Sequence, residues 1–213
     1  MKFIRRWAYA CAKGLALQLN ESHRQRGVYY YGFQIVIGSL VKVVSLIAIS
    51  LLLGTLMPTL AILLAFVLLR IIAGGYHMDT YGKCIAASDT LFAIAGIISR
   101  YTYEYWTTWQ AAILIGITFT LGSCVLYRWA PKDTPNKPIT KPEKIKRLKT
   151  LSMVYMAAWL LIASALLYYN LRLYVLAASF GVLIELFTIT PLGTGFFDFL
   201  SSFSLQKGPK VLK

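Results

Sequence analysis

Six long apolar stretches dominate this sequence of 213 residues and limit what it can fold into. A helix needs about 20 mostly apolar residues to cross the hydrocarbon core of a bilayer. The chain is 58% hydrophobic and only 14% charged, whereas soluble domains have about 45–50% apolar and about 25% charged residues. We therefore expect an all-α, polytopic integral membrane protein that forms a single domain over residues 1–213. Its six transmembrane helices are predicted at 33–54, 55–73, 85–105, 111–130, 151–168 and 171–190.

The lysine and arginine residues fall almost entirely in alternate connecting segments. When the ends of the stretches are counted with the connections they adjoin, 19 of the 22 lie before the first stretch, between the second and third, between the fourth and fifth, or after the sixth. The other connections hold only Arg100 and Arg172, and Lys42 lies within the first stretch. Cytoplasmic loops of membrane proteins carry such an excess of basic residues. We therefore predict that both termini are cytoplasmic, with residues 131–150 as a basic cytoplasmic loop and 191–213 as a C-terminal tail. This topology accounts for the net charge of +14 without a nucleic-acid partner.

The N-terminal segment, residues 1–27, contains too many interrupting charges to be a secretory signal. Its apolar residues recur at helical spacing, and basic residues lie between them; the apolar set is Phe3, Ile4, Trp7, Ala8, Cys11, Leu15 and Leu19. This pattern predicts an amphipathic helix on the membrane surface, in contact with lipids. The alternative is an ordinary helix packed against the bundle.

One polar stretch, residues 70–89, departs from a plain membrane helix. It places His77 and Cys84 seven residues apart on the predicted cytoplasmic side. Ionisable groups at membrane depth are costly, and this makes them candidates for function. A cysteine nucleophile needs a base to become a thiolate near neutral pH, and histidine is the usual one. The pair therefore suggests nucleophilic catalysis in a compartment where thiols stay reduced.

The spacing of the pair requires a bend in the chain. On one continuous helix, residues seven apart lie about 10.5 Å apart along the axis, too far for a hydrogen-bonded pair. Gly74-Gly75 and Gly82 are suitable helix breakers. Cys84 would then lie in the first turn of the third membrane helix. There the helix dipole and Lys83 would both favour the thiolate.

His77 and Cys84 also have other interpretations. A single histidine at the membrane edge is commonly an interfacial residue, and a single cysteine commonly packs as a small apolar side chain. His77 and Asp79 could ligate a metal, but no second histidine is near, so we expect neither a metal nor a cofactor. The alternative function is a small peptide or lipid transporter or exporter, with His77 and Cys84 lining the path. The sequence lacks the inverted pair of interrupted helices that many transporters have.

Three motifs together resemble a known family. They are Arg70-x-x-x-Gly74-Gly75-Tyr76-His77 followed by Cys84 and Ser88, then Pro131-x-x-Thr134-x-Asn136-Lys137-Pro138-Ile139, and finally Thr190-Pro191-Leu192-Gly193. They resemble the AgrB family, which comprises membrane cysteine endopeptidases of Gram-positive quorum sensing. The resemblance extends over nearly the whole chain, including its six spans and basic N-terminal region.

The resemblance implies a multi-pass protein of the bacterial cell membrane whose partner is an AgrD-like propeptide. Such a propeptide has an amphipathic leader, a short cyclisable centre and an acidic C-terminal tail. By this resemblance Cys84 is the nucleophile and His77 the general base, both on the cytoplasmic side. Cleavage on the C-terminal side of the centre would pass through an acyl-enzyme thioester, and cyclisation would give a thiolactone or lactone peptide. The family also suggests a homodimer.

Further residues are candidates for substrate-binding or supporting roles. Arg70 would bind a propeptide carboxylate, hold the loop, or form a structural ion pair with Asp79. Lys132, Lys137 and the basic run 141–149 would steer the acidic tail. The remaining supporting candidates are Gly75, Lys83 and Ser88, and the residue that orients His77 is one of Asp79, Ser88, Asp89 and Gln34.

Overall fold

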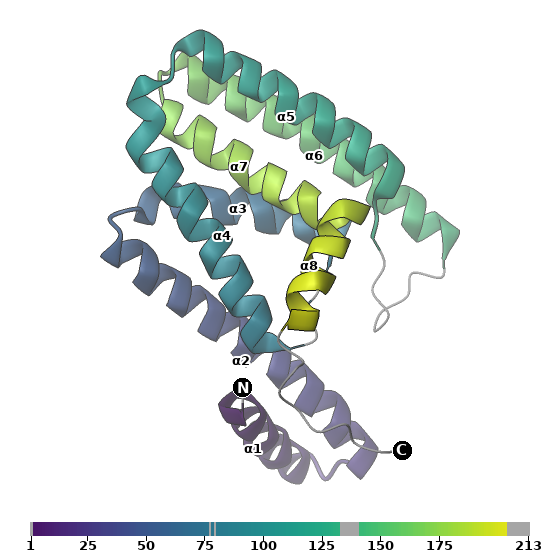
Figure 1. The fold of residues 1–213 in the computed structure, drawn as a ribbon. Coiled ribbons are helices and arrows are strands. Elements are labelled where there is room, and N and C mark those ends of the chain that lie inside the picture. Colours follow the sequence, from purple (N-terminus) through teal and green to yellow (C-terminus); the bar gives the residue numbers. More distant parts are fainter. Residues whose placement is uncertain (1, 77, 79, 133–140, 204–213) are drawn as a thin grey trace.

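The computed structural model describes residues 2–76, 78, 80–132 and 141–203 of the chain. This part is built from helices and contains no strand (Figure 1). The helices are α1 (Lys2–Gln18), α2 (His23–Leu52), α3 (Leu56–Ala73), α4 (Tyr81–Thr102), the 3-10 helix η1 (Tyr103–Tyr105), α5 (Thr108–Trp129), α6 (Pro142–Tyr168), α7 (Arg172–Ile189) and α8 (Pro191–Phe203).

Six of these helices, α2 to α7, are long and apolar enough to cross a membrane. This confirms the all-α class and the predicted number of spans. The helices also expose large apolar side chains, among them Leu64, Ile71 and Leu161. Such exposure is expected where a helix faces lipid. The cytoplasmic placement of the termini stays a prediction.

Helices α3 and α7 form the centre of the bundle. They pack closely because Gly181 brings α7 against the backbone of Ile62 on α3, where a Cβ atom would overlap the Ile62 carbonyl. Small residues allow this close approach between membrane helices. Helices α5 and α6 pack on one side of this pair, and α2 and α4 lie on the other (Figure 1).

Helix α1 packs against α2. Ile4, Ala8 and Ala12 recur every four residues and are almost fully buried, whereas Phe3 and Trp7 are more than half exposed. The predicted apolar face is therefore divided between a contact with α2 and an exposed aromatic edge. The helix itself is present as expected, and its position on a membrane surface stays a prediction.

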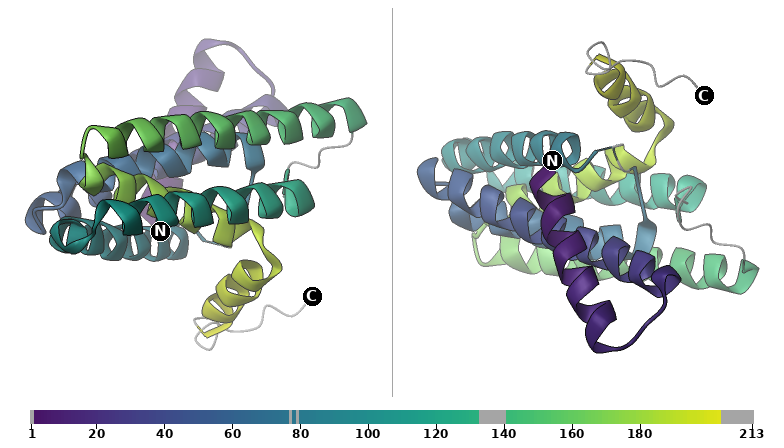
Figure 2. Two further views of the ribbon diagram at one scale, coloured as in Figure 1. Left: turned by 90° about the horizontal axis from the view of Figure 1, so that it is seen from above. Right: turned by 90° about the horizontal axis from the view of Figure 1, so that it is seen from below.

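Two segments predicted as loop or tail are helical. Residues 142–150 form the first turns of α6, and residues 191–203 form α8. Both helices begin at a proline, Pro142 and Pro191. A proline ends a preceding helix, but at a first helical position its missing N–H costs nothing and its fixed φ suits the helix. The basic loop is therefore shorter than predicted, and α8 projects from the end of α7 (Figure 2).

Candidate functional site

The break between α3 and α4 lies where the sequence predicted a bend. Helix α3 ends at Ala73, and Gly74 and Gly75 follow with φ values of 73° and 142°. Backbone with positive φ is favoured for glycine because it has no Cβ atom. The prediction that Gly82 also breaks the helix is wrong, since Gly82 is the second residue of α4. The helix begins before it because Thr80 caps the N-terminus.

Cys84 lies in the first turn of α4, as predicted. The Thr80 hydroxyl accepts a hydrogen bond from Lys83 N at 3.4 Å, and Thr80 O accepts one from Cys84 N at 3.1 Å. These bonds fix the backbone of Cys84 at the positive end of the helix dipole. The thiol residue is half-buried. His77 and Asp79, the other two residues predicted in this segment, lie outside the described residues.

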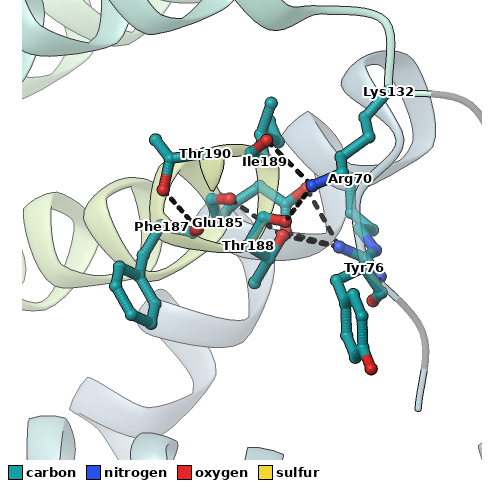
Figure 3. Close-up of polar contacts among 8 residues, drawn as sticks. All are labelled: Arg70, Tyr76, Lys132, Glu185, Phe187, Thr188, Ile189 and Thr190. Carbon is teal, nitrogen blue, oxygen red and sulfur yellow. Dashed lines mark hydrogen bonds and ion pairs between the residues drawn. The ribbon is translucent and has the colours of Figure 1, made fainter. Parts of the chain in front are cut away.

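A buried ion pair joins the end of α3 to α7 (Figure 3). Arg70 Nη1 lies 3.3 Å from Glu185 Oε2 and donates to Thr188 Oγ1 at 2.7 Å. The Glu185 side chain is 0% exposed and that of Arg70 is 17% exposed. A buried carboxylate requires such a partner because leaving water is costly for a charge. Among the acidic residues that the structure describes, the partner of Arg70 is Glu185. Asp79, the partner considered from the sequence, lies outside the described residues.

The same guanidinium holds the chain beyond the glycine pair. Arg70 Nη2 donates to Tyr76 O, while Tyr76 N donates to Thr188 O at 3.3 Å. Both backbone groups of Tyr76 are thereby fixed against α3 and α7. Gly75 lies between these contacts, and a Cβ atom there would overlap the Arg70 guanidinium and approach Thr188 Oγ1. Arg70 thus holds the backbone at Tyr76, and the missing side chain of Gly75 leaves room for the guanidinium. The part that these two residues play in function stays a prediction.

Lys132 connects the segment that follows α5 to the ends of α3 and α7. Its N–H donates to Ala73 O at 2.8 Å, and its ammonium donates to Ile189 O at 3.0 Å (Figure 3). A cation at the C-terminus of a helix satisfies terminal carbonyls and interacts favourably with the dipole. Burial is the main cause that lowers the pKa of Lys132; Arg70 lowers it further, and Asp198 opposes the shift. Lys137, the other lysine predicted here, lies outside the described residues.

Two of the polar candidates on α4 have defined partners. Ser88 Oγ donates to Cys84 O at 2.7 Å, one helical turn earlier. Asp89 is 5% exposed, and its Oδ2 atom accepts a hydrogen bond of 2.6 Å from Ser45 of α2. Within the part of the chain that the structure describes, Asp89 Oδ1 is buried without a hydrogen-bond partner. Gln34 is half-buried on α2.

Helix α8 contacts both ends of the segment between α3 and α4. Tyr76 Oη donates to Asp198 Oδ1 at 2.6 Å, and Lys83 Nζ donates to Ser201 O at 2.8 Å. Sequence reasoning missed these contacts because it treated residues 191–213 as a tail. It also missed Glu185, although a single carboxylate inside a long apolar stretch is itself a signal for a functional or paired group.

These contacts define what the site can do chemically. A half-buried thiol lies in the first turn of a helix, where the backbone dipoles favour a developing oxyanion. The chain leading to it is held by a buried ion pair. Such an arrangement suits a cysteine nucleophile at the edge of a membrane bundle.

Comparison with known proteins finds one matching family and several relatives that are similar over most of the chain. The family model described as "Accessory gene regulator B" matches residues 6–189. "Putative AgrB-like protein 2" of Clostridium perfringens strain 13 is 26% identical over 201 residues, which cover 91% of this chain and 94% of that protein. "Putative AgrB-like protein" of C. perfringens strain SM101 is 27% identical over 88% of this chain and 91% of its own length. A protein of the same printed name from Halalkalibacterium halodurans is 26% identical over 85% and 84%. No solved structure is significantly similar to the chain.

The match to the family model extends from α1 to the last residue of α7. It therefore includes all six apolar helices, with Arg70 on α3, Cys84 on α4 and Gly75 between these two helices. Family and helices together indicate a multi-pass membrane protein of the accessory gene regulator system. This chain belongs to the accessory gene regulator B family.

Proposed function

We propose that the chain is a membrane cysteine endopeptidase that cleaves an AgrD-like propeptide on the C-terminal side of its centre and promotes cyclisation. The observation that carries the proposal is the break between α3 and α4. Because a new helix begins after this break, Cys84 lies in its first turn. The basic residues gathered at this end of the bundle support an active site that opens to the cytoplasm.

In the first step His77 takes the proton of the Cys84 thiol, and the thiolate attacks the carbonyl that joins the centre to the tail. A carbon–sulfur bond forms and the carbonyl oxygen becomes an oxyanion. Backbone N–H groups at the start of α4 are the proposed donors to it. The carbon–nitrogen bond then breaks, and the amine of the tail leaves with the proton from His77. The product of this step is an acyl-enzyme thioester.

In the second step a cysteine or serine side chain of the bound propeptide attacks the thioester. His77 takes the proton of the attacking group as the new ring bond forms. The bond to Cys84 then breaks, and His77 returns the proton to the Cys84 sulfur. Exchange of one thioester for another is close to balanced in energy, whereas formation of a thioester from an amide is uphill. We therefore propose that the site excludes water, which would otherwise hydrolyse the intermediate, and that release of the acidic tail helps to drive the reaction.

The nucleophile assignment is tested by cleavage of a candidate propeptide by the purified protein in liposomes. We expect Cys84→Ala and His77→Ala each to lower the cleavage rate by more than about 10³-fold, because residues of a nucleophile–base pair act as a unit. Cys124→Ala is the control, since this exposed cysteine lies on α5 and not on the segment that carries His77 and Cys84. Trapping of a propeptide–Cys84 adduct would exclude a transporter as the full account. Cleavage by the Cys84→Ala protein would show that the nucleophile is another residue.

Attraction of the acidic tail is assigned to the first turns of α6. Lys144 and Arg147 are exposed there, whereas the ammonium of Lys132 is engaged by carbonyls of α7. Lys137 remains a second candidate for the same role. We expect the double change Lys144→Gln/Arg147→Gln to raise KM about three- to tenfold at low salt with kcat unchanged, because two exposed ion pairs with the tail are lost.

The dependence of KM on salt concentration distinguishes electrostatic attraction of the tail from an effect of the two substitutions on the fold. The KM values of wild type and variant should converge at about 1 M salt, where the Debye length is about 3 Å. Arg100→Gln is the control, because Arg100 lies in the last turn of α4, at the opposite end of the bundle. A KM difference that persists at high salt would contradict an electrostatic role.

A further inference from the structure

We propose that the C-terminal helix α8 positions the catalytic segment, with Asp198 and the Ser201 carbonyl as its two anchors. This inference rests on the function proposed above and deepens it. The segment between α3 and α4 is held on one side by Arg70 and α7. Helix α8 is the element that holds it on the other side.

The first anchor acts on the residue that directly precedes His77 in the sequence. Tyr76 Oη donates to Asp198 Oδ1 at 2.6 Å, and the Tyr76 ring stacks on Phe197 with centroids 5.5 Å apart and an interplanar angle of 13°. The hydrogen bond fixes the end of the side chain and the stack fixes its plane. Since Arg70 and Thr188 already hold the backbone of Tyr76, the residue has little freedom left.

The second anchor acts on the residue that directly precedes Cys84. Lys83 Nζ donates to Ser201 O at 2.8 Å, and Ser201 is 4% exposed. Asp198 and Ser201 are three residues apart on α8 and so lie on the same face of the helix. One helix face therefore contacts the neighbours of both candidate catalytic residues.

Helix α8 can act as an anchor because its own position is fixed by α7. Gly193 packs so closely on the end of α7 that a Cβ atom would overlap Phe187 O. Phe197 is 5% exposed and packs edge-on against Phe187 and Phe196, with centroids 5.9 and 5.5 Å away. Because α8 is held in this way, it can fix the positions of the two residues that it contacts, Tyr76 and Lys83. Asp198 and Ser201 are thus positioning residues and not catalytic residues.

The test uses the full-length protein in liposomes and the propeptide cleavage assay. Misplacement of a reacting group by about 1 Å costs about 10²-fold in rate, so we expect Asp198→Ala and Tyr76→Phe each to lower kcat by about 10- to 100-fold with KM nearly unchanged. Asp198→Asn retains an acceptor for the Tyr76 hydroxyl and should recover most of the rate. The double change Asp198→Ala/Tyr76→Phe should be no worse than either single change, because both remove the same bond.

A second measurement does not depend on the propeptide. In a Cys11→Ser/Cys124→Ser background, Cys84 is the remaining thiol, and its alkylation by iodoacetamide reports its local environment. We expect Lys83→Met and Asp198→Ala to change this rate at least threefold, and Lys83→Arg to retain the wild-type value. Ser202→Ala is the control on α8, because its hydroxyl donates to Phe199 O within the same helix.

The outcomes distinguish this inference from the proposed function. If Cys84→Ala abolishes cleavage while Asp198→Ala and Tyr76→Phe keep the wild-type kcat and alkylation rate, the role of α8 is refuted and the peptidase stands. If Cys84→Ala still cleaves, the proposed nucleophile is wrong. A fall in kcat that Asp198→Asn does not restore would also count against the Tyr76–Asp198 bond as the positioning contact.

Discussion

Replacing Arg70 by methionine should destabilise the folded protein by about 3–5 kcal/mol, because removal of one partner leaves a buried charge uncompensated. The charge is that of Glu185, whose side chain is fully buried on α7. The Thr188 hydroxyl remains within 3.3 Å of Glu185 Oε2, but a single neutral donor does not replace a guanidinium. Unfolding in mixed detergent micelles, followed by tryptophan fluorescence, measures the change.

The double change Arg70→Met/Glu185→Leu is the matched control for this prediction. A buried ion pair can be replaced by apolar side chains with little loss of stability, so the double variant should recover most of the free energy of unfolding. It should not recover peptidase activity, because Tyr76 O has lost the guanidinium that holds it. If the free-energy losses of the two single variants, Arg70→Met and Glu185→Leu, instead add in the double variant, the two side chains are not coupled. The interpretation that their ion pair holds the site together would then be wrong.

Gly75→Ala should strain the backbone at the site and displace the Arg70 guanidinium. The φ of 142° at this position is unfavourable for alanine, and the new Cβ atom would meet the Arg70 guanidinium and Thr188 Oγ1. Strain of this kind costs about 1–3 kcal/mol. The larger effect is on catalysis, since a displaced Arg70 releases the loop before Cys84. We expect kcat/KM for the propeptide to fall about 10²-fold.

Gly116→Ala is the control for this substitution. Gly116 lies within α5, and a Cβ atom there meets nothing within 4 Å. Alanine is favoured over glycine inside a helix by about 0.5–1 kcal/mol, so this variant should be as active as wild type and at least as stable. Wild-type kcat/KM in the Gly75→Ala protein would mean that the loop tolerates a different path and that Arg70 does not control it.

The six spans could be predicted because the information is local. Each span needs only a sufficient run of apolar residues, and the structure has a helix at every predicted position. The bend at Gly74-Gly75 could be predicted for the same reason, since adjacent glycines signal a break wherever they stand. The helices that begin at Pro142 and Pro191 were predicted as loop and tail, and this has a local cause too. A proline ends the helix before it but suits the first position of the next helix.

The helical class, the number of spans, the bend before the cysteine and the family could all be predicted from the sequence, because they depend on composition, spacing and short motifs. The contacts that hold the site together could not be predicted, because they join residues far apart in the chain. Glu185 lies 115 residues from Arg70, and the contacts of α8 with Tyr76 and Lys83 span 122 and 118 residues. The pair of Arg70 and Glu185 forms because folding leaves a buried charge no water to bind. The contacts of α8 form because packing of α8 against the end of α7 brings these residues together, at whatever distance in sequence.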